Sequence, residues 1–311
     1  ADKNGSKSIG FLGSPYGTNE ELYLYQKLFR LGLGTNNLDH KAYADTPGLP
    51  VDHHDFLNIE TSNLVLLIAS DPAEELPILD LRIKKAVTRR GVKLVVLNDQ
   101  VTLLDRFAAL SLRYNVGSDQ VALGALTSGL AAELGMPSAP SKKNYESITG
   151  IAAGQMKSVV DLVRAGTKVS IVYNPAALSG DSVHVLKHLL AVIGKIPEIE
   201  CGAIPAAPFT NALGAMDMGI LPDFYPGGVS LANTEKIRQA WGENAPLVKG
   251  LSALEMIDKA AQGELKALLV YRCNPVVDFP GGKKIEDALR KLDLLVVHDM
   301  MNTETSRLAN I

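Results

Sequence analysis

Two loops of the sequence have the composition and the position to hold an anionic ligand. The first is the turn Gly13–Thr18 (GSPYGT), which follows the apolar run Ser8–Leu12 and precedes an amphipathic segment that begins at Asn19. A glycine-rich turn between a strand and a helix points N–H groups outward and can cradle a phosphate. The turn can equally be a plain connection, because no fuller phosphate-binding pattern accompanies it.

The second loop follows the short apolar run Ala267–Tyr271 and contains Asn274 and Pro275. A fully apolar run of this length is typical of a strand that is covered on both faces in a parallel sheet. Ligands of open α/β sheets bind just beyond the carboxyl ends of such strands. We therefore expect this loop to border any site that the chain carries.

A third stretch, residues 32–55, contains three histidines and four aspartates. Histidine and carboxylate side chains ligate metals, but their spacing here matches no helix-borne pair of ligands, so polar loop residues are expected. Only two cysteines, Cys201 and Cys273, occur in the chain, which excludes a cluster held by four of its own thiolates. The residues of the stretch are His40, His53, His54, Asp39, Asp45, Asp52 and Asp55.

Length and composition narrow the class of protein. The chain has 311 residues, 46% of them hydrophobic, and a formal net charge of −3, which allows about two domains. The balanced charge predicts no nucleic-acid partner. No apolar stretch reaches the ~18 residues of a membrane-spanning helix, and the first residues lack the apolar core of a signal peptide. We therefore expect no direct membrane insertion and a cytoplasmic location.

Apolar runs alternate with amphipathic segments along the chain, which predicts an α/β fold with mainly parallel sheets. Residues 136–147 are rich in proline, serine and lysine and resemble a linker, and residues 198–246 show little regular pattern. The expected strands are 8–12, 64–69, 92–97, 168–173, 267–271 and 294–298. The expected helices are 19–31, 79–90, 121–134, 151–165, 182–193, 233–241, 253–262 and 284–292.

Six blocks of sequence together form a recognisable pattern. They are GTNEELYLYQKLFRLGLGTNNLDH (Gly17–His40), SDPAEELPILDLRIKKAV (Ser70–Val87), GSDQVAL (Gly117–Leu123), GAMDMGILPDFYPGG (Gly214–Gly228), YRCNPV (Tyr271–Val276) and LDLLVVHDMMNTETSRLA (Leu292–Ala309). In type and order they resemble the molybdopterin oxidoreductase family. The resemblance implies two doubly wound, mainly parallel α/β domains of the formate dehydrogenase and DMSO reductase type. One domain would comprise residues 1–36 plus 146–311, and residues 37–145 would be inserted in it.

In that family the two domains hold a bis-molybdopterin guanine dinucleotide. The resemblance places seven residues of this chain along the corresponding cleft, which we expect to be vestigial. They are Thr18, Asn19, Asp71, Glu74, Asp119, Asn274 and Pro275.

The chain departs from the family pattern where the cofactor is held. Ala69 and Asp71 replace the Gly and Asn of the GSNPAE motif, Asn98–Gln100 replaces DPR, and Arg272 replaces the Gly of G-x-N-P. A glycine lets a ligand approach the backbone closely, which the Arg272 side chain obstructs. Gln100 cannot neutralise a phosphate as arginine does, and the added carboxylate of Asp71 repels one.

The metal ligand of the family is also missing. The Mo-binding cysteine or selenocysteine of formate dehydrogenases follows the GTNN block, and the corresponding stretch Asp39–Asp45 (DHKAYAD) contains no cysteine. A carboxylate ligates Mo in some members, so Asp45 is the one candidate metal ligand under the catalytic alternative.

Three functions are compatible with these residues. The leading expectation is the G-subunit branch of NADH-quinone oxidoreductase (respiratory complex I), because the family blocks occur together with lost ligand residues. The LDHK sequence at Leu38–Lys41 also resembles the corresponding sequence of complex I G subunits. There the chain would be a structural part of the peripheral arm, without cofactor or catalysis of its own. Its partners would be the other peripheral-arm subunits, at the cytoplasmic face of the inner membrane, and iron–sulfur clusters would lie before residue 1. One alternative is a fragment of a formate-dehydrogenase-like enzyme with Asp45, Asp119 and Asn274 at the cofactor. The other is a nucleotide-binding module that uses Gly13–Thr18 and Asn274.

Overall fold

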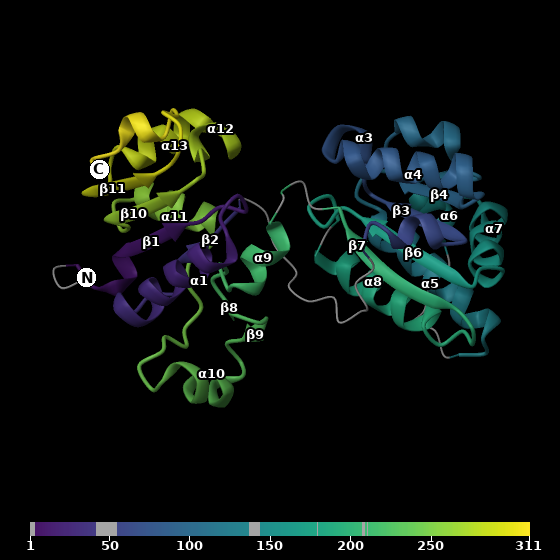
Figure 1. The fold of residues 1–311 in the computed structure, drawn as a ribbon, viewed down its shortest axis with the longest axis horizontal. Helices are drawn as coiled ribbons and strands as arrows, with labels where there is room; N and C mark the ends of the chain where they lie inside the picture. The colour runs from purple at the N-terminus through teal and green to yellow at the C-terminus, as the bar shows by residue number, and fades with distance from the viewer. Residues whose placement is uncertain (1–3, 42–54, 137–143, 179, 207–208, 210) are drawn as a thin grey trace. The chain divides into compact units, whose positions relative to one another are not determined.

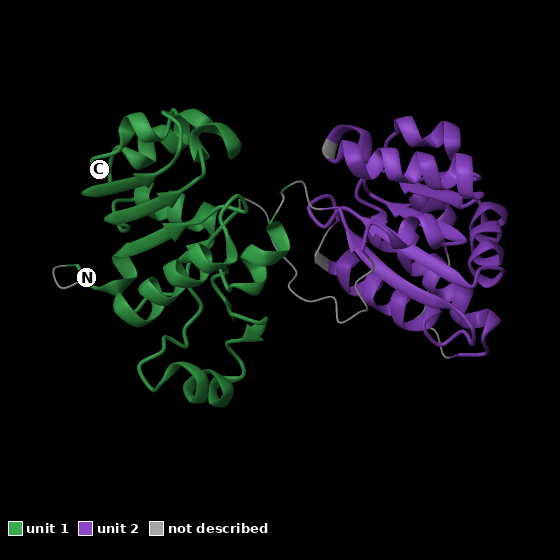
Figure 2. Ribbon diagram, in the orientation of Figure 1, with its two compact units in different colours: residues 1–47, 209–311 green, residues 48–208 purple. Residues whose placement is uncertain are grey.

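The computed structural model describes residues 4–41, 55–136, 144–178, 180–206, 209 and 211–311. The chain forms two compact units (Figures 1 and 2): unit 1 comprises residues 1–47 and 209–311, and unit 2 comprises residues 48–208. Each contains a parallel sheet with helices packed on it, so the predicted α/β class is confirmed. No helix among the described residues is long and apolar enough to cross a membrane.

Unit 1 is built on a four-stranded parallel sheet with the order β11-β10-β1-β2. The central strand β1 pairs on one side with β10, in the register Ile9↔Ala267, and on the other side with the very short β2, in the register Phe11↔Leu38. Beyond β10 lies β11, as the apolar pattern predicted. The strands are β1 (Ile9–Leu12), β2 (Leu38–Asp39), β10 (Ala267–Tyr271) and β11 (Leu294–His298).

Helices cover both faces of this sheet because successive residues of a strand point to opposite sides. Leu12 of β1 packs with Met256 and Ile285, whereas Phe11 packs with Leu22 and Phe29. The first face is covered by α11 (Ala253–Ala261) and α13 (Gly282–Leu289), and the second by α1 (Asn19–Lys27) and the π-turn η2 (Leu28–Gly32). The remaining elements of unit 1 are η1 (Ser6–Ser8), α9 (Ala212–Asp217), β8 (Phe224–Tyr225), β9 (Val229–Ser230), α10 (Thr234–Trp241), α12 (Pro275–Asp278) and η4 (Ser306–Leu308).

The buried side chain of Arg30 fixes the segment that follows α9. Its five N–H groups all have acceptors, and its guanidinium lies 4.3 Å from the centre of the Tyr225 ring. The acceptors are Asn36 Oδ1 (2.9 Å), Gln26 Oε1 (3.0 Å) and the carbonyl oxygens of Gly219 (2.8 Å), Leu221 (2.8 Å) and Phe224 (2.7 Å). A buried arginine is tolerated when all its donors are satisfied. Burial lowers its pKa to about 10, which leaves it charged at neutral pH.

Unit 2 contains five parallel strands in the order β5-β4-β3-β6-β7. The chain runs outward from β3 to β4 and β5, then returns to place β6 on the other side of β3, so the sheet is doubly wound with a switch point between β3 and β6. The strands are β3 (Leu64–Ile68), β4 (Lys93–Asn98), β5 (Leu110–Arg113), β6 (Lys168–Tyr173) and β7 (Glu200–Pro205).

Two apolar layers enclose this sheet, one on each face. One contains Leu66, Leu126 and Leu186, and the other contains Leu67 and Ile83. The helices of the first layer include α5 (Asp119–Glu133), α7 (Ala153–Arg164) and α8 (Gly180–Ile193), and α4 (Pro77–Arg90) belongs to the second. The shorter helices are α2 (Asn58–Thr61), α3 (Pro72–Glu75), η3 (Leu103–Phe107) and α6 (Tyr145–Thr149).

The division into units differs from the predicted one. Residues 146–208 were assigned to the discontinuous domain, but β6 pairs with β3 in the register Leu64↔Val169, and β7 pairs with β6. These residues therefore complete the sheet of unit 2, and the second boundary lies at 208/209 instead of 145/146. The first boundary lies at 47/48 instead of 36/37, because β2 pairs with β1.

Candidate functional site

The switch point of the unit 1 sheet lies between β1 and β10. From β1 the chain proceeds to β2 on one side, and β10 joins β1 on the other. Two loops leave the carboxyl ends of these neighbouring strands, residues 13–18 after β1 and residues 272–274 after β10. Ligands of doubly wound folds bind at this position, so the two loops define the candidate site of unit 1.

Backbone N–H groups of the loop after β1 donate hydrogen bonds to acceptors within the chain. Gly13 N donates to the Asp39 carbonyl oxygen (2.8 Å), and Gly17 N donates to that of Ser14 (3.1 Å). At the start of α1, Thr18 N donates to Glu21 Oε2 (3.0 Å) and Glu21 N donates to Thr18 Oγ1 (3.3 Å). This capping box places a carboxylate where an anion cradle needs a positive field. The loop is therefore a poor phosphate cradle.

Arg272 occupies the space between the two loops. Its backbone has φ +47°, in the left-handed region that glycine adopts most easily. Its Nη1 donates to the Tyr16 carbonyl oxygen (3.1 Å), and its Nη2 lies 3.5 Å from Glu21 Oε1. The side chain, only 24% exposed, thus bridges the ends of β10 and β1.

Glu21 is the acidic partner in this bridge. Its pKa is lowered by the neighbouring Tyr271 hydroxyl, by the Thr18 backbone N–H and by Arg272. The carboxylate is therefore charged at neutral pH. A phosphate that entered the switch point of unit 1 would meet this negative charge and would have to displace the guanidinium from it.

The predicted site residue Asn274 lies beside Arg272, but its side chain is engaged within the chain. Its Oδ1 accepts from Thr305 Oγ1 (2.7 Å) and Thr305 N (3.2 Å), and its Nδ2 donates to Glu304 Oε2 (2.8 Å). Pro275 is buried at the first position of α12. Asn274 therefore holds the C-terminal segment against the end of β10.

Thr18 and Asn19 also have structural partners. Thr18 caps α1 in the capping box with Glu21. Asn19 Oδ1 accepts from Asn211 Nδ2 (2.8 Å), and the same amide nitrogen donates to the Gly17 carbonyl oxygen (2.9 Å). Asn211 therefore holds the loop after β1 on one side, while Arg272 holds it on another.

The buried group Asp39–His40–Lys41 at the end of β2 was expected only as polar loop residues. Asp39 Oδ2 accepts from Ala253 N at the start of α11 (2.8 Å), and Oδ1 accepts from His40 N (2.8 Å). Burial raises the pKa of Asp39 to about 7 and lowers that of Lys41 to about 7. His40 Nδ1 donates to the Ile220 carbonyl oxygen (2.8 Å), and burial lowers the His40 pKa to about 3. The imidazole is therefore neutral at physiological pH.

The two asparagines of the GTNN sequence before β2 bind the segment Pro246–Leu251, which we call the strap. Asn36 Nδ2 donates to the carbonyl oxygens of Pro246 and Val248 (2.8 Å each). Asn37 Oδ1 accepts from Leu251 N (2.9 Å). The sequence signal was two adjacent asparagines after a left-handed glycine, but their partners lie about 210 residues away in the chain.

The switch point of unit 2 shows the same kind of change as that of unit 1. Ala69 follows β3 with φ +50°, and Asp71 caps α3 by accepting from Ala73 N (3.3 Å). Asn98 Nδ2, at the end of β4, donates to the Ser70 carbonyl oxygen (3.2 Å). The backbone conformation suited to glycine is present, and the side chains bond to the chain itself.

Negative charge surrounds the unit 2 site. Burial raises the pKa of Asp71, and the carboxylates of Glu74, Asp80 and Asp105 contribute further. Asp119 is buried as the first residue of α5. Asp71, Glu74 and Asp119 belong to unit 2, and Thr18, Asn19, Asn274 and Pro275 belong to unit 1.

Metal binding has little support within the described part of the chain, where no group of three or more histidine, cysteine or carboxylate residues could hold an ion. Asp45, His53 and His54 lie outside the described residues. Burial raises the pKa of the Cys201 thiol to about 12. It also raises the pKa of the Cys273 thiol. Both cysteines are therefore protonated at neutral pH and are poor metal ligands.

Comparison with known proteins relates this architecture to a family. Residues 1–311 match the molybdopterin oxidoreductase family. The chain is 28% identical over 339 residues to NADPH-Fe(3+) oxidoreductase subunit alpha of Geobacter sulfurreducens, an alignment that covers 99% of this chain and 40% of the relative. It is 28% identical over 338 residues to F420-dependent formate dehydrogenase 1 subunit alpha of Methanococcus maripaludis (98% and 50% covered).

A further relative is the G 2 subunit of the NADH-quinone oxidoreductase of Rhizobium meliloti, 27% identical over 326 residues (98% and 38% covered). The chain thus spans half or less of the length of these three relatives. Among solved structures, acetylene hydratase from Pelobacter acetylenicus has the same fold, with a TM-score of 0.65, 18% identity and coverage of 99% of this chain and 49% of the other. The chain belongs to the molybdopterin oxidoreductase family.

Proposed function

We propose that this chain is the molybdopterin-oxidoreductase-like part of a G-type subunit of NADH-quinone oxidoreductase, with a structural role and no catalysis of its own. The likeness to the Rhizobium meliloti G 2 subunit supports this assignment. In such a subunit the chain would lie in the peripheral arm on the cytoplasmic side and contact other peripheral-arm subunits. Iron–sulfur clusters would be carried by sequence before residue 1.

The observation that carries the proposal is the position of Arg272 at the unit 1 switch point. The family cofactor contains dinucleotide phosphates, which need open space and N–H donors at strand ends. Here the guanidinium is bonded to Tyr16 and paired with Glu21. The N–H groups of Gly13, Tyr16, Gly17 and Thr18 in the loop after β1 have acceptors in the chain. The residues present in unit 1 therefore do not fit a dinucleotide phosphate.

Unit 2 supports the same conclusion. Asp71 and Glu74 add carboxylates near the end of β3, whereas the nearby Asp80 and Asp105 are paired with Lys84 and Arg113. Gln100 stands where the family motif has arginine. The two switch points lie in separate units, so each supports the proposal independently. We infer that the fold of the family is retained as a scaffold.

The decisive experiment is analysis of the purified full-length protein for molybdenum, tungsten and pterin. We expect all three far below one per chain, with a formate dehydrogenase relative from the same expression host as the positive control. Stoichiometric metal with pterin would overturn the proposal. Affinity purification at native expression should in addition recover other subunits of an NADH-quinone oxidoreductase, and their absence would remove the complex I assignment alone.

A second candidate is a cofactor-binding fragment of a formate-dehydrogenase-like enzyme, with bis-molybdopterin guanine dinucleotide. It is favoured by the left-handed backbone at Ala69 and Arg272, which the glycines of the family motif would adopt, and by Asp119 buried at the start of α5. In it Asp45 would ligate the metal, and Asp119 and Asn274 would contact the dinucleotide. An Asp45→Ala variant that keeps full formate oxidation in the complete protein would exclude Asp45 as the ligand.

A further inference from the structure

We propose that the amino-terminal edge of the unit 1 sheet carries a second site, which binds an organic phosphate of mononucleotide size. A cavity of about 500 Å³ opens there, within the ~300–1,000 Å³ typical of small-molecule sites. It is lined by Ser8 and Leu265, which precede β1 and β10, and by the strap Pro246–Leu251. It therefore lies at the opposite sheet edge from Arg272 and is distinct from the candidate cofactor site.

The wall formed by the strap is held in place before any ligand binds. The side-chain amides of Asn36 and Asn37 bond to three of its backbone groups, and the Tyr225 hydroxyl donates to the Pro246 carbonyl oxygen (3.0 Å). Gly250 lies against the backbone of Asn36, where a Cβ would come within 1.8 Å of the carbonyl oxygen. A preorganised wall favours binding because little ordering is needed when a ligand enters.

The charged side chains of the lining favour an anion. Lys7, Lys249 and Lys259 contribute ammonium groups, and Glu264 is the single carboxylate of the lining. Glu264 is paired with Lys259 (2.8 Å), and Lys249 Nζ lies 3.4 Å from Asp223 Oδ2. Lys7 and Lys249 are exposed at the rim, in a chain whose net charge is −3. Lysine binds phosphate as a flexible point charge.

The apolar side chains of the lining indicate that the anion has an apolar or planar body. Leu247 and Leu251 line the same cavity and are partly exposed, whereas Leu265 is 1% exposed and offers little surface. A phosphate at the lysine rim and a flat ring against these leucines would use both parts of the surface. Inorganic phosphate would contact only the lysines. An organic phosphate would also contact the leucines and should therefore bind more tightly.

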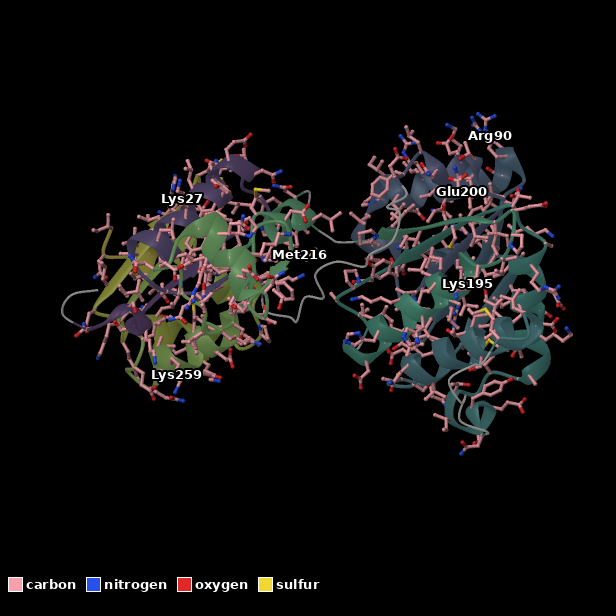
Figure 3. The ribbon with its side chains drawn as sticks, turned by 90° about the horizontal axis from the view of Figure 1, so that it is seen from below. Lys27, Arg90, Lys195, Glu200, Met216 and Lys259 are labelled. Carbon is pink, nitrogen blue, oxygen red and sulfur yellow. The ribbon has the colours of Figure 1, made fainter. Side chains whose placement is uncertain are left out.

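The test is isothermal titration of the purified full-length protein with AMP, adenosine and inorganic phosphate. We expect AMP to bind more tightly than either component. The double variant Lys7→Glu/Lys249→Glu should weaken AMP binding by roughly tenfold or more, because two charge-assisted contacts are reversed. Lys27→Glu is the matched control and should leave AMP binding unchanged. Figure 3 labels Lys27, on α1, and Lys259, on α11, at opposite sides of unit 1.

Three outcomes would overturn the site. They are no AMP binding at millimolar concentration, equal affinity for AMP and adenosine, and AMP binding that the lysine variant leaves intact although its melting temperature is unchanged. An Arg272→Gly variant separates this site from the cofactor cleft. AMP binding that depends on Arg272 and not on Lys7 and Lys249 would place the ligand at the other edge.

Discussion

Arg272 Nη1, at the end of β10, donates a hydrogen bond to the Tyr16 carbonyl oxygen in the loop after β1, over 3.1 Å. The bond joins the two strands between which a doubly wound sheet opens its ligand crevice. It is made by a residue whose backbone has φ +47°, so it is retained against a conformational cost. The consequences of this contact can be measured separately from any binding assay.

Arg272→Gly and Arg272→Ala should separate the backbone cost from the side-chain contacts. Both variants lose the bonds to Tyr16 and Glu21, but only alanine keeps a Cβ in the left-handed region, which costs about 1–2 kcal/mol. We therefore expect the glycine variant to be more stable than the alanine variant by about 1 kcal/mol in urea unfolding. Equal stabilities would show that position 272 carries no backbone strain.

Arg30→Met should destabilise the protein strongly. The substitution leaves the carbonyl oxygens of Gly219, Leu221 and Phe224 without their donor, and buried unsatisfied groups cost about 1–3 kcal/mol each. We expect the substitution to lower the free energy of unfolding by about 3–5 kcal/mol. Arg30→Lys should restore little, because an ammonium cannot reproduce the planar fork. The exposed Arg90→Met at the end of α4 is the control and should change stability by less than about 0.5 kcal/mol.

Asp39 should make stability fall as pH rises from about 4 to about 7. Its folded pKa is raised to about 7 from the ordinary value of 3.8. In this window the folded state holds a proton that the unfolded state has released, so raising the pH favours unfolding. Asp39→Asn should flatten this part of the pH profile of urea unfolding, whereas Asp161→Asn on the exposed surface of α7 should not. If the stability of the Asp39→Asn variant falls as steeply with pH as that of the wild type, the expected titration of Asp39 is contradicted.

Asn274→Asp should be more harmful than Asn274→Ala. The amide Nδ2 donates to Glu304 Oε2 over 2.8 Å, so an aspartate would set two carboxylates against each other. We expect a further loss of stability at pH 7 relative to alanine, recovered by adding Glu304→Gln. If Asn274 instead serves the cofactor alternative, Asn274→Ala would lower molybdenum content with little effect on stability.

The sequence predicted the strands that are mostly apolar and missed those that are shorter or more polar. Leu64–Ile68, Lys168–Tyr173 and Ala267–Tyr271 were expected because buried parallel strands lack polar alternation. Leu110–Arg113 is short with polar residues between its leucines, and Glu200–Pro205 contains only a brief apolar core. Local periodicity therefore carried too little signal for β5 and β7.

Pairing partners were harder to predict than the strands themselves. Residues 136–147 have the composition of a linker, and the family resemblance implies a domain boundary beside them, yet β6 returns to pair with β3. The same limit applied to Arg30, which in the sequence is one polar residue of an amphipathic segment. Its acceptors at Gly219–Phe224 are about 190 residues away, and only the tertiary structure brings them together.

The candidate site was predicted in part. The replacement of glycine by Arg272 was evident from the family motif, but its positive φ and its bond to Tyr16 were not. The side-chain amide of Asn274 was expected along a ligand cleft, and the structure shows it bonded to Thr305 and Glu304. Whether these residues also contact a cofactor in the complete protein stays a prediction.

The placement of β1 at the centre of a discontinuous sheet has a consequence during synthesis. Unit 2 is continuous and can fold once residue 208 has left the ribosome, whereas Ile9 of β1 must wait for Ala267. At translation rates of roughly 5–20 residues per second, that wait is on the order of tens of seconds. During that interval β1 can pair only with the two-residue β2, so the edge of β1 that will bind β10 stays open on the nascent chain.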